Sequence, residues 1–235
     1  MVDVEDLSIS LIGQHSLWGH LVWNGARVAR RLLQGETIDG IAWTCPEVKG
    51  KTVLELGAAG CVPTLTAAKA GAAAAIASDF PEPAILQNCE DNLDRNLKGE
   101  QRARANVVGY RWGEPIDCLV STLNDTVEAG SPAHTGFDII VLADLLAFAA
   151  GHAKLAQTTK DALSREPGSV ALVSFGHHNV QFVERDLLFF DRCREVGLIV
   201  EKVGQIDMEP MFPSDPGEAK IRAAVHVFTL KHAAE

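Results

Sequence analysis

The sequence predicts an α/β fold, in which a parallel sheet carries helices on both faces. Residues 52–79 form an apolar run, a small-residue turn, a segment of helical character and a second apolar run that stops at an acid. This is the pattern of a strand-turn-helix-strand unit. Residues 137–143 (FDIIVLA) are almost continuously apolar, as expected of a central parallel strand covered on both sides. The chain of 235 residues is long enough to bury a core, and we expect one domain over residues 1–235.

The N-terminal part is expected to be an arm followed by a helix. The first residues are polar and mixed, so we expect an arm over about residues 1–16. The next segment has apolar residues at helical spacing, with Asn24 as a candidate cap and Gly35 as the end of the helix. Trp18 and Trp23 lie near the start of this helix, where tryptophan more often packs in a core or lid than contacts a ligand.

Residues 52–79 are predicted to form a nucleoside-binding crevice. Small residues at 57–60 let the backbone bend sharply off the strand and lie against a ligand. The helix beyond Pro63 points its positive end into the same crevice. Asp79 stands 22 positions after Gly57, close to the spacing at which an acid that closes a second parallel strand binds a ribose. The alternative is an ordinary parallel-sheet turn that binds nothing.

The composition of the turn favours S-adenosylmethionine over a dinucleotide. A dinucleotide site requires G-x-G-x-x-G, whereas GAAGC (57–61) has glycine only at its first and fourth positions. Glu55, two residues before the turn, suits a cationic ligand better than a pyrophosphate. S-adenosylmethionine offers a ribose to Asp79, has no phosphate, and carries an ammonium and a sulfonium that match an acidic rim.

Later strand ends place further candidates beside this crevice. A helix from Pro83 and a strand at 105–110 lead to Trp112, whose flat face either covers an adenine or plugs the sheet edge. The strand at 137–143 ends at Asp144. The last two strands are joined by a Pro-rich loop without a clear helix, so we expect one of them to run antiparallel. The other expected elements are helices at 152–164 and 179–195, strands at 169–174, 198–203 and 224–230, and a long excursion at 114–136.

Composition narrows the class of partner. Lys and Arg total 21 against 31 Asp and Glu, a net charge of -10, which argues against a nucleic-acid surface and for a basic or cationic partner. Five widely spaced cysteines without C-x-x-C suggest neither a disulfide framework nor a metal site. No apolar run is long enough to span a membrane, and the acidic residues 1–6 are unlike a signal peptide, so we expect a cytoplasmic location.

Several longer motifs resemble the class I methyltransferases that use S-adenosylmethionine, and within them the family-16 protein methyltransferases. The sequence is most similar to the fungal enzymes that methylate the N-terminal region of translation elongation factor 1A, members of which were once labelled nicotinamide N-methyltransferases. The motifs that carry the resemblance are LWGHLVWNGARV (17–28), VLELGAAGCVPTL (53–65), SDFPEPAILQNCEDNLDRN (78–96), RWGEP (111–115), FDIIVLADLL (137–146), SFGHH (174–178) and PMFPSDPGEAKIRAAV (210–225).

The resemblance implies a Rossmann-like sheet of seven strands, mostly parallel with the last strand antiparallel. It also implies cofactor contacts: Trp23 closes over the cofactor, a turn lies under its aminoacyl end, Asp79 binds its ribose, Trp112 stacks on its adenine and the backbone of Ala143 lies near it. The turn residues are Gly57, Ala58 and Ala59. This chain departs from many relatives, which have glycine at Ala59 and Cys61, and from others in which Arg-Pro follows the paired histidines.

The expected chemistry is an in-line transfer of a methyl group to a neutral amine, for which the protein aligns the two reactants and excludes water. An N-terminal amine with a pKa near 8 is partly free at pH 7, whereas a lysine with a pKa near 10.4 is not. Asp144 is the candidate catalytic residue that orients the ammonium or takes its proton, and a helix cap is its alternative role. His177 or His178 could serve as a base, and adjacent residues in such a turn usually point apart.

The resulting hypothesis is a monomeric enzyme that methylates the N-terminal glycine, an adjacent lysine, or both, in elongation factor 1A. A small-molecule N-methyltransferase acting on a nicotinamide-like acceptor and a non-catalytic cofactor-binding module are the two alternatives.

Overall fold

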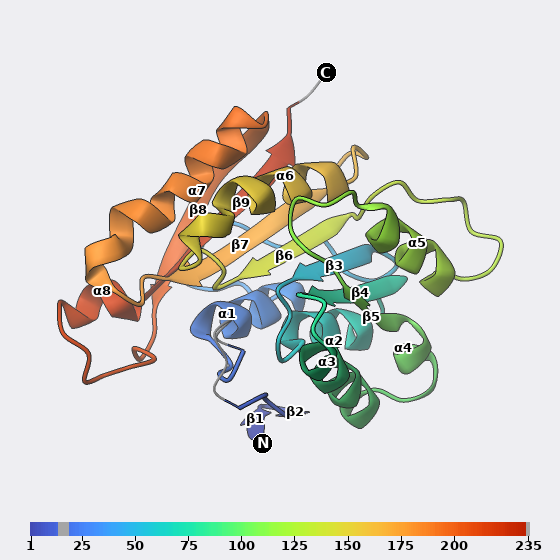
Figure 1. The fold of residues 1–235 in the computed structure, drawn as a ribbon, viewed down its shortest axis with the longest axis horizontal. Coiled ribbons are helices and arrows are strands. Elements are labelled where there is room, and N and C mark those ends of the chain that lie inside the picture. The colour runs from blue at the N-terminus through green and yellow to red at the C-terminus, as the bar shows by residue number, and fades with distance from the viewer. Residues whose placement is uncertain (14–18, 234–235) are drawn as a thin grey trace.

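The computed structural model describes residues 1–13 and 19–233, and Trp18 lies outside the described residues. Its centre is a seven-stranded sheet in the order β5-β4-β3-β6-β7-β9-β8 (Figure 1). Within this sheet β9 runs antiparallel to both of its neighbours, and the pairs among β5, β4, β3, β6 and β7 are parallel. The predicted sheet, with its last strand antiparallel, is therefore confirmed. The strands are β3 (Thr52–Leu56), β4 (Ala74–Asp79), β5 (Ala105–Gly109), β6 (Ile139–Ala143), β7 (Val170–Gly176), β8 (Leu198–Asp207) and β9 (Ala224–His232).

Helices cover both faces of the sheet, as the sequence predicts (Figure 1). On β3, Val53 belongs to one buried cluster and Leu54 to the other, because successive strand residues point to opposite faces. The Val53 side packs against α1 (Asn24–Leu33), α2 (Val62–Lys69) and α3 (Pro83–Asn96). The Leu54 side packs against α5 (Asp117–Thr126), α6 (His152–Ala162) and α7 (Val183–Glu195). Short helices α4 (Gly99–Ala103), η1 (Ala149–Gly151), η2 (Val180–Phe182) and α8 (Ala219–Ala223) lie in connections.

The predicted N-terminal arm contains a β-hairpin that is fastened to the body of the protein. Strands β1 (Val2–Val4) and β2 (Leu7–Ile9) pair antiparallel, and the side chain of Ile9 is fully buried. The backbone N–H groups of Ser8 and Ser10 donate to asparagine side chains of α3. The buried guanidinium of Arg30 in α1 pairs with two carboxylates of the hairpin turn, Glu5 and Asp6. Two strands of three residues each are too short for hydrophobic alternation to predict them.

The start of α1 differs from the expectation that Asn24 caps it. Asn24 is the first helical residue, and its side-chain amide donates to the carbonyl of Glu209 instead of accepting from the helix. A distant carboxylate, that of Asp144, accepts the N–H of Gly25 in its place. The helix stops as predicted, because Gly35 follows it with a φ of +77°. No helix within the described residues is long and apolar enough to cross a membrane.

Candidate active site

A cavity of about 480 Å³ opens at the carboxyl ends of the parallel strands, where open α/β sheets bind their ligands. It brings together most of the site residues predicted from the sequence. These are Trp23, Gly57, Ala59, Asp79, Trp112, Ala143 and Asp144. Ala58 is the exception, because it is buried behind the turn, where its N–H donates to the carbonyl of Ser78. The turn and the strand ends therefore meet around one hollow.

The turn after β3 keeps a glycine-like backbone even where glycine is absent. Gly57 has a φ of +65°, and a Cβ there would lie 2.6 Å from Leu145 Cδ2, so a side chain at this position would be strained and would displace Leu145. Ala59 and Cys61 also have positive φ values, of +43° and +60°. The left-handed region costs an L-residue roughly 1–2 kcal/mol. Ala59 and Cys61 therefore hold, at an energetic cost, a backbone conformation that glycine adopts more easily.

Asp79, at the end of β4, has a carboxylate that is fixed by backbone groups. Its Oδ2 accepts the N–H of Ala59 at 2.8 Å, and its Oδ1 accepts the N–H of Phe80 at 2.7 Å. Each oxygen of an ionised carboxylate can accept more than one hydrogen bond, so an acid at this strand end is of the type that binds sugar hydroxyls. The turn and the acid are therefore one hydrogen-bonded unit.

Glu55 does not face a ligand, contrary to the expectation from its place before the turn. Its carboxyl is buried and accepts both the N–H and the hydroxyl of Thr64, at 2.9 and 2.5 Å, so it caps the first turn of α2. Burial raises the pKa of Glu55 to about 8, and the hydrogen bonds from Thr64 oppose that rise. Its role is to hold the helix behind the turn.

One end of the cavity is aromatic. The ring of Trp112 lies edge-on to Phe148, with centroids 6.1 Å apart, and Arg111 places its guanidinium 4.7 Å from the centre of the Phe80 ring. All four residues line the cavity. Sequence reasoning identified Trp112 but missed Phe80 and Phe148. Phe80 directly follows Asp79 at a strand end, and that position was the available signal.

A second group of side chains in the same cavity is centred on the carboxylate of Asp144. It accepts the backbone N–H of Gly25 and, at 2.9 Å, that of Gly176, while His178 Nε2 lies 3.1 Å from it. The Asp144 side chain is only 1% exposed, and its backbone has a φ of +56°. Asp144 therefore does cap a helix, which was its alternative predicted role. The capped helix is α1, however, and not the segment that follows β6.

Trp23 packs against this second group. Its ring centroid lies 4.4 Å from that of His178 and 5.9 Å from that of Phe212. The loop that carries Phe212 is held by Arg222, whose buried guanidinium donates to the carbonyl of Phe212. The indole of Trp23 thus packs against residues that follow β7 and β8 and still lines the cavity.

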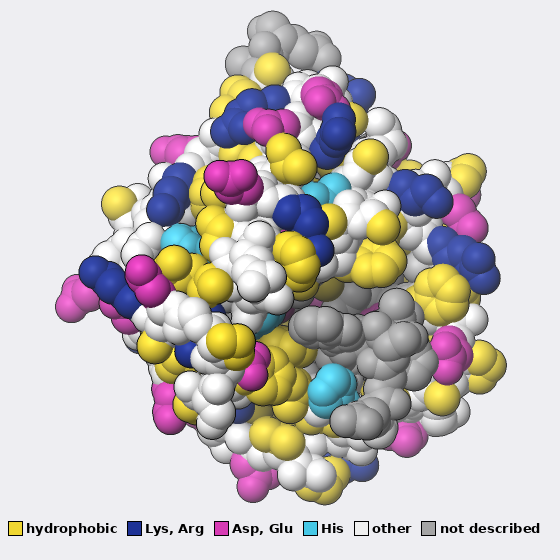
Figure 2. Space-filling view, turned by 60° about the vertical axis from the view of Figure 1, so that its left-hand side comes forward, with side chains coloured by type: hydrophobic (Ala, Val, Ile, Leu, Met, Phe, Trp, Pro, Cys, Tyr) yellow, Lys and Arg dark blue, Asp and Glu magenta, His cyan; other side chains and the backbone are white. Residues whose placement is uncertain are grey.

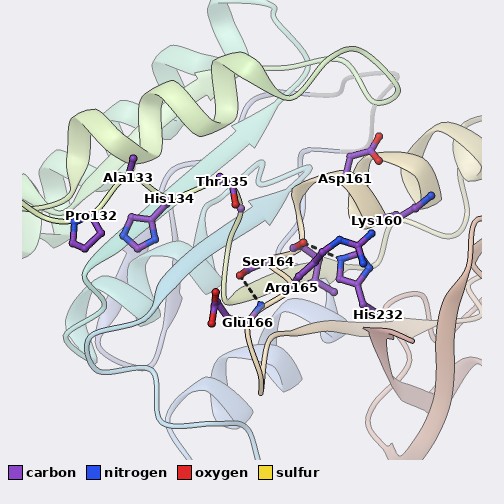
Figure 3. Close-up of a pocket in the computed structure, with 12 residues that line it drawn as sticks. Pro132, Ala133, His134, Thr135, Lys160, Asp161, Ser164, Arg165, Glu166 and His232 are labelled. Carbon is purple, nitrogen blue, oxygen red and sulfur yellow. Dashed lines mark hydrogen bonds between the residues drawn. The ribbon is translucent and has the colours of Figure 1, made fainter. Parts of the chain in front are cut away.

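A second cavity, of about 540 Å³, lies at the other end of the parallel strands, near the points where β6 and β7 begin (Figure 3). It is lined by residues 132–136, by the end of α6 and by His232 near the end of β9. Figure 3 shows that both basic and acidic side chains surround it, including Lys160, Asp161, Arg165 and Glu166. Because it lies where parallel strands begin, the crevice predicted from the sequence is the first cavity.

The family of the chain follows from sequence comparison. A model of the lysine methyltransferase family, family 16, matches residues 2–195. The chain belongs to this family. It is therefore an S-adenosylmethionine-dependent methyltransferase, which confirms the predicted family, activity and cofactor.

Individual relatives agree with this assignment. The methyltransferase is 38% identical to the protein N-terminal and lysine N-methyltransferase EFM7 of Eremothecium gossypii, over 96% of this chain and 80% of that one. It is 34% identical to the protein of the same name in Schizosaccharomyces pombe, over 96% and 82% of the two chains. Among solved structures, the ribosomal protein L11 methylase of Lactobacillus delbrueckii has the same fold, with a TM-score of 0.51 and 14% identity over 88% of this chain and 79% of that one.

The residues of the first cavity fit the cofactor of this methyltransferase. Gly57 leaves space that a Cβ would fill, Asp79 offers fixed acceptors, and flat rings line one end. A volume of about 480 Å³ is within the range of small-molecule sites, roughly 300–1,000 Å³.

Proposed function

We propose that this methyltransferase modifies the N-terminal glycine of translation elongation factor 1A, the lysine next to it, or both. The observation that carries the proposal is the extent of the similarity to the EFM7 proteins, which are named protein N-terminal and lysine N-methyltransferases and match over 96% of this chain. Elongation factor 1A is proposed because the family motifs resemble those of the fungal enzymes that act on it. We place the reaction in the cytoplasm and propose that the enzyme acts as a monomer.

The charge of the molecule is consistent with a basic acceptor. The net charge of -10 attracts a lysine-bearing protein terminus over a distance of about one Debye length, roughly 8–10 Å at physiological salt. Figure 2 shows that acidic and basic side chains alternate over one face of the molecule. Long-range attraction on that face is therefore diffuse, and selection of one particular amine falls to the cavity.

We propose that the predicted cofactor-binding residues contact different parts of the cofactor along the cavity. Asp79 holds the ribose hydroxyls, and Trp112 covers the adenine. The backbone of Ala143 and the turn residues Gly57 and Ala59 hold the central and aminoacyl parts, and Ala58 supports the turn through its hydrogen bond to Ser78. Trp23 closes over the cofactor from the start of α1. The cofactor, when bound, supplies a methyl group on a positively charged sulfur.

Asp144 is proposed to act at the acceptor end of the cavity. Its carboxylate is held by the N–H groups of Gly25 and Gly176, so it has a fixed position beside the cavity. A fixed negative charge orients an incoming ammonium and the groups around it without rearrangement during the reaction. The protein residues thus align the acceptor nitrogen and exclude water, and no covalent enzyme intermediate is required.

Incubation with labelled cofactor and purified elongation factor 1A tests the acceptor. We expect label in the first few residues, located by mass spectrometry of the N-terminal peptide. An N-terminally acetylated factor is the matched control, because acetylation blocks the α-amine but leaves the lysines free. Label that appears only in distant residues would reject this acceptor. Turnover of free nicotinamide with no labelling of the protein would favour the small-molecule alternative.

A further inference from the structure

The two adjacent histidines after β7 have different surroundings. His177 Nδ1 lies 3.1 Å from Asp186 Oδ2, and both side chains are 4% exposed. His178 is 10% exposed, lines the cavity and lies beside Asp144. As the sequence suggests, only one of the pair, His178, faces the site.

The contact with Asp144 fixes the proton arrangement of His178. An ionised carboxylate can only accept a hydrogen bond, so we assign His178 Nε2 as the donor in this 3.1 Å contact. In the neutral ring the other nitrogen, Nδ1, then carries a lone pair. The indole of Trp23 packs 4.4 Å from the imidazole centroid and limits rotation of the ring.

This arrangement has the parts of a base and its orienting carboxylate. We propose that His178 is the base that removes the proton from the acceptor ammonium, with Asp144 as its positioning residue. The proposal rests on the proposed function, because that function supplies an amine that arrives protonated. It leaves the charge of Asp144 to orient the ammonium but gives its carboxylate, which already accepts three hydrogen bonds, no direct part in removing the proton.

The proton and electron balance of the step is complete without another reactant. The acceptor ammonium gives one proton to His178 Nδ1 and becomes a neutral amine. The lone pair of the amine forms the new N–C bond to the methyl group, and the electron pair of the broken S–C bond stays on sulfur. The products are a methylated ammonium and an imidazolium, which then releases its proton to solvent.

The surroundings of His178 stabilise the imidazolium that forms. The Nε2–H···Asp144 bond becomes charge-assisted, and such bonds are roughly twice as strong as neutral ones. The face of the Trp23 indole attracts a cation within about 6 Å. The charged side chains that face the same cavity are Asp79, Arg111, Asp144 and Lys154.

The substitution His178→Gln tests the basic function of the side chain separately from its hydrogen bond to Asp144. His178→Gln can still donate to Asp144 but cannot take a proton. We expect its single-turnover rate at pH 7 to fall by up to about tenfold, since roughly a tenth of an α-amine with a pKa near 8 is neutral there. The rate should approach that of the unmodified enzyme at pH 9, where the α-amine loses its proton to solvent. A loss of equal size at both pH values, or no loss at either, would overturn the proposal.

Two controls accompany the rate measurement. His178→Gln should bind S-adenosylhomocysteine within twofold of the unmodified protein in calorimetry, and a loss of affinity equal to the rate loss would also overturn the proposal. His134→Gln, a substitution of the same type beside the second cavity, should leave the rate unchanged at both pH values.

A second measurement needs neither acceptor nor turnover. Nitrogen chemical shifts of ¹⁵N-histidine-labelled protein report which ring nitrogen carries the proton. We expect His178 to be the Nε2–H tautomer, and Asp144→Asn to shift it toward Nδ1–H, because the new amide can donate to Nε2. An Nδ1–H tautomer in the unmodified protein would overturn the proposal. Failure to label elongation factor 1A would instead reject the acceptor and leave this result standing.

Discussion

Gly151 allows the role of Trp112 to be tested without removing the indole. Gly151 ends η1 and precedes α6 with φ -92° and ψ -8°, a conformation with negative φ that is open to alanine. A Cβ at this position would lie 2.9 Å from two carbons of the Trp112 ring and 2.8 Å from Phe148 Cδ1. Since carbon atoms pack at about 3.5–4.0 Å, Gly151→Ala must displace the indole by roughly 0.6–1 Å.

The size of the effect follows from this displacement. A base stacked on an aromatic ring contributes about 1–3 kcal/mol, and a gap of 0.5–1 Å loses a quarter to a half of the contact energy. Gly151→Ala should therefore weaken the binding of S-adenosylhomocysteine by roughly 0.3–1.5 kcal/mol, or about 2- to 10-fold. Trp112→Ala should weaken it by about 1–3 kcal/mol, because the whole stacking face is removed.

A double-mutant cycle measured by isothermal titration calorimetry decides the question. In the Trp112→Ala background, Gly151→Ala should have a clearly smaller effect, because the indole is absent and only the contact with Phe148 remains. Gly13→Ala is the matched control, since a Cβ there would lie within 4 Å of none of the residues that the structure describes. Unchanged affinity in Gly151→Ala, or an equal loss in both backgrounds, would show that Trp112 does not contact the adenine.

Three further predictions follow from the site. Asp79→Ala should abolish binding of S-adenosylhomocysteine in calorimetry while circular dichroism shows that the fold persists; unchanged affinity would place the ribose elsewhere. Ala59→Gly should raise the melting temperature by a few degrees, because glycine relieves the cost of a φ of +43°, and a fall would contradict the strain inferred for the turn. Because the pKa of Glu55 is raised to about 8, its carboxyl keeps a proton in the folded state that it loses near pH 4.5 in the unfolded chain. The free energy of unfolding that Glu55 contributes therefore falls as the pH rises from about 4.5 to 8. Glu55→Gln should remove that slope in denaturant titrations between pH 5 and 8, and an unaltered slope would assign it to another group.

Much of the fold could be predicted because short stretches of the sequence indicate its parallel strands. The continuous apolar run at 137–143 and the pattern at 52–79 each indicate a parallel strand, and parallel strands place their carboxyl ends at one edge. This explains why Trp112, selected for its place after a strand, does line the cavity together with Asp79. The spacing of residues along the chain was sufficient for both.

Other features depend on contacts between distant segments, which no local pattern encodes. The carboxylate of Asp144 caps a helix that begins 119 residues earlier in the sequence, near Gly25. Glu55 turns away from the ligand because Thr64 offers it two donors once α2 has packed. The hairpin at the N-terminus has strands of only three residues and is held by the buried Arg30, so local alternation could not distinguish it from an arm.

The position of β9 between β7 and β8 has a consequence for biosynthesis. A nascent chain that has emerged only as far as residue 223 contains β7 and β8 but lacks the strand that hydrogen-bonds to both. Each of these strands then exposes an unpaired edge, which is a template for aggregation. We infer that the sheet closes late during translation, and that premature stop codons upstream of β9 produce insoluble protein and not a partly active enzyme.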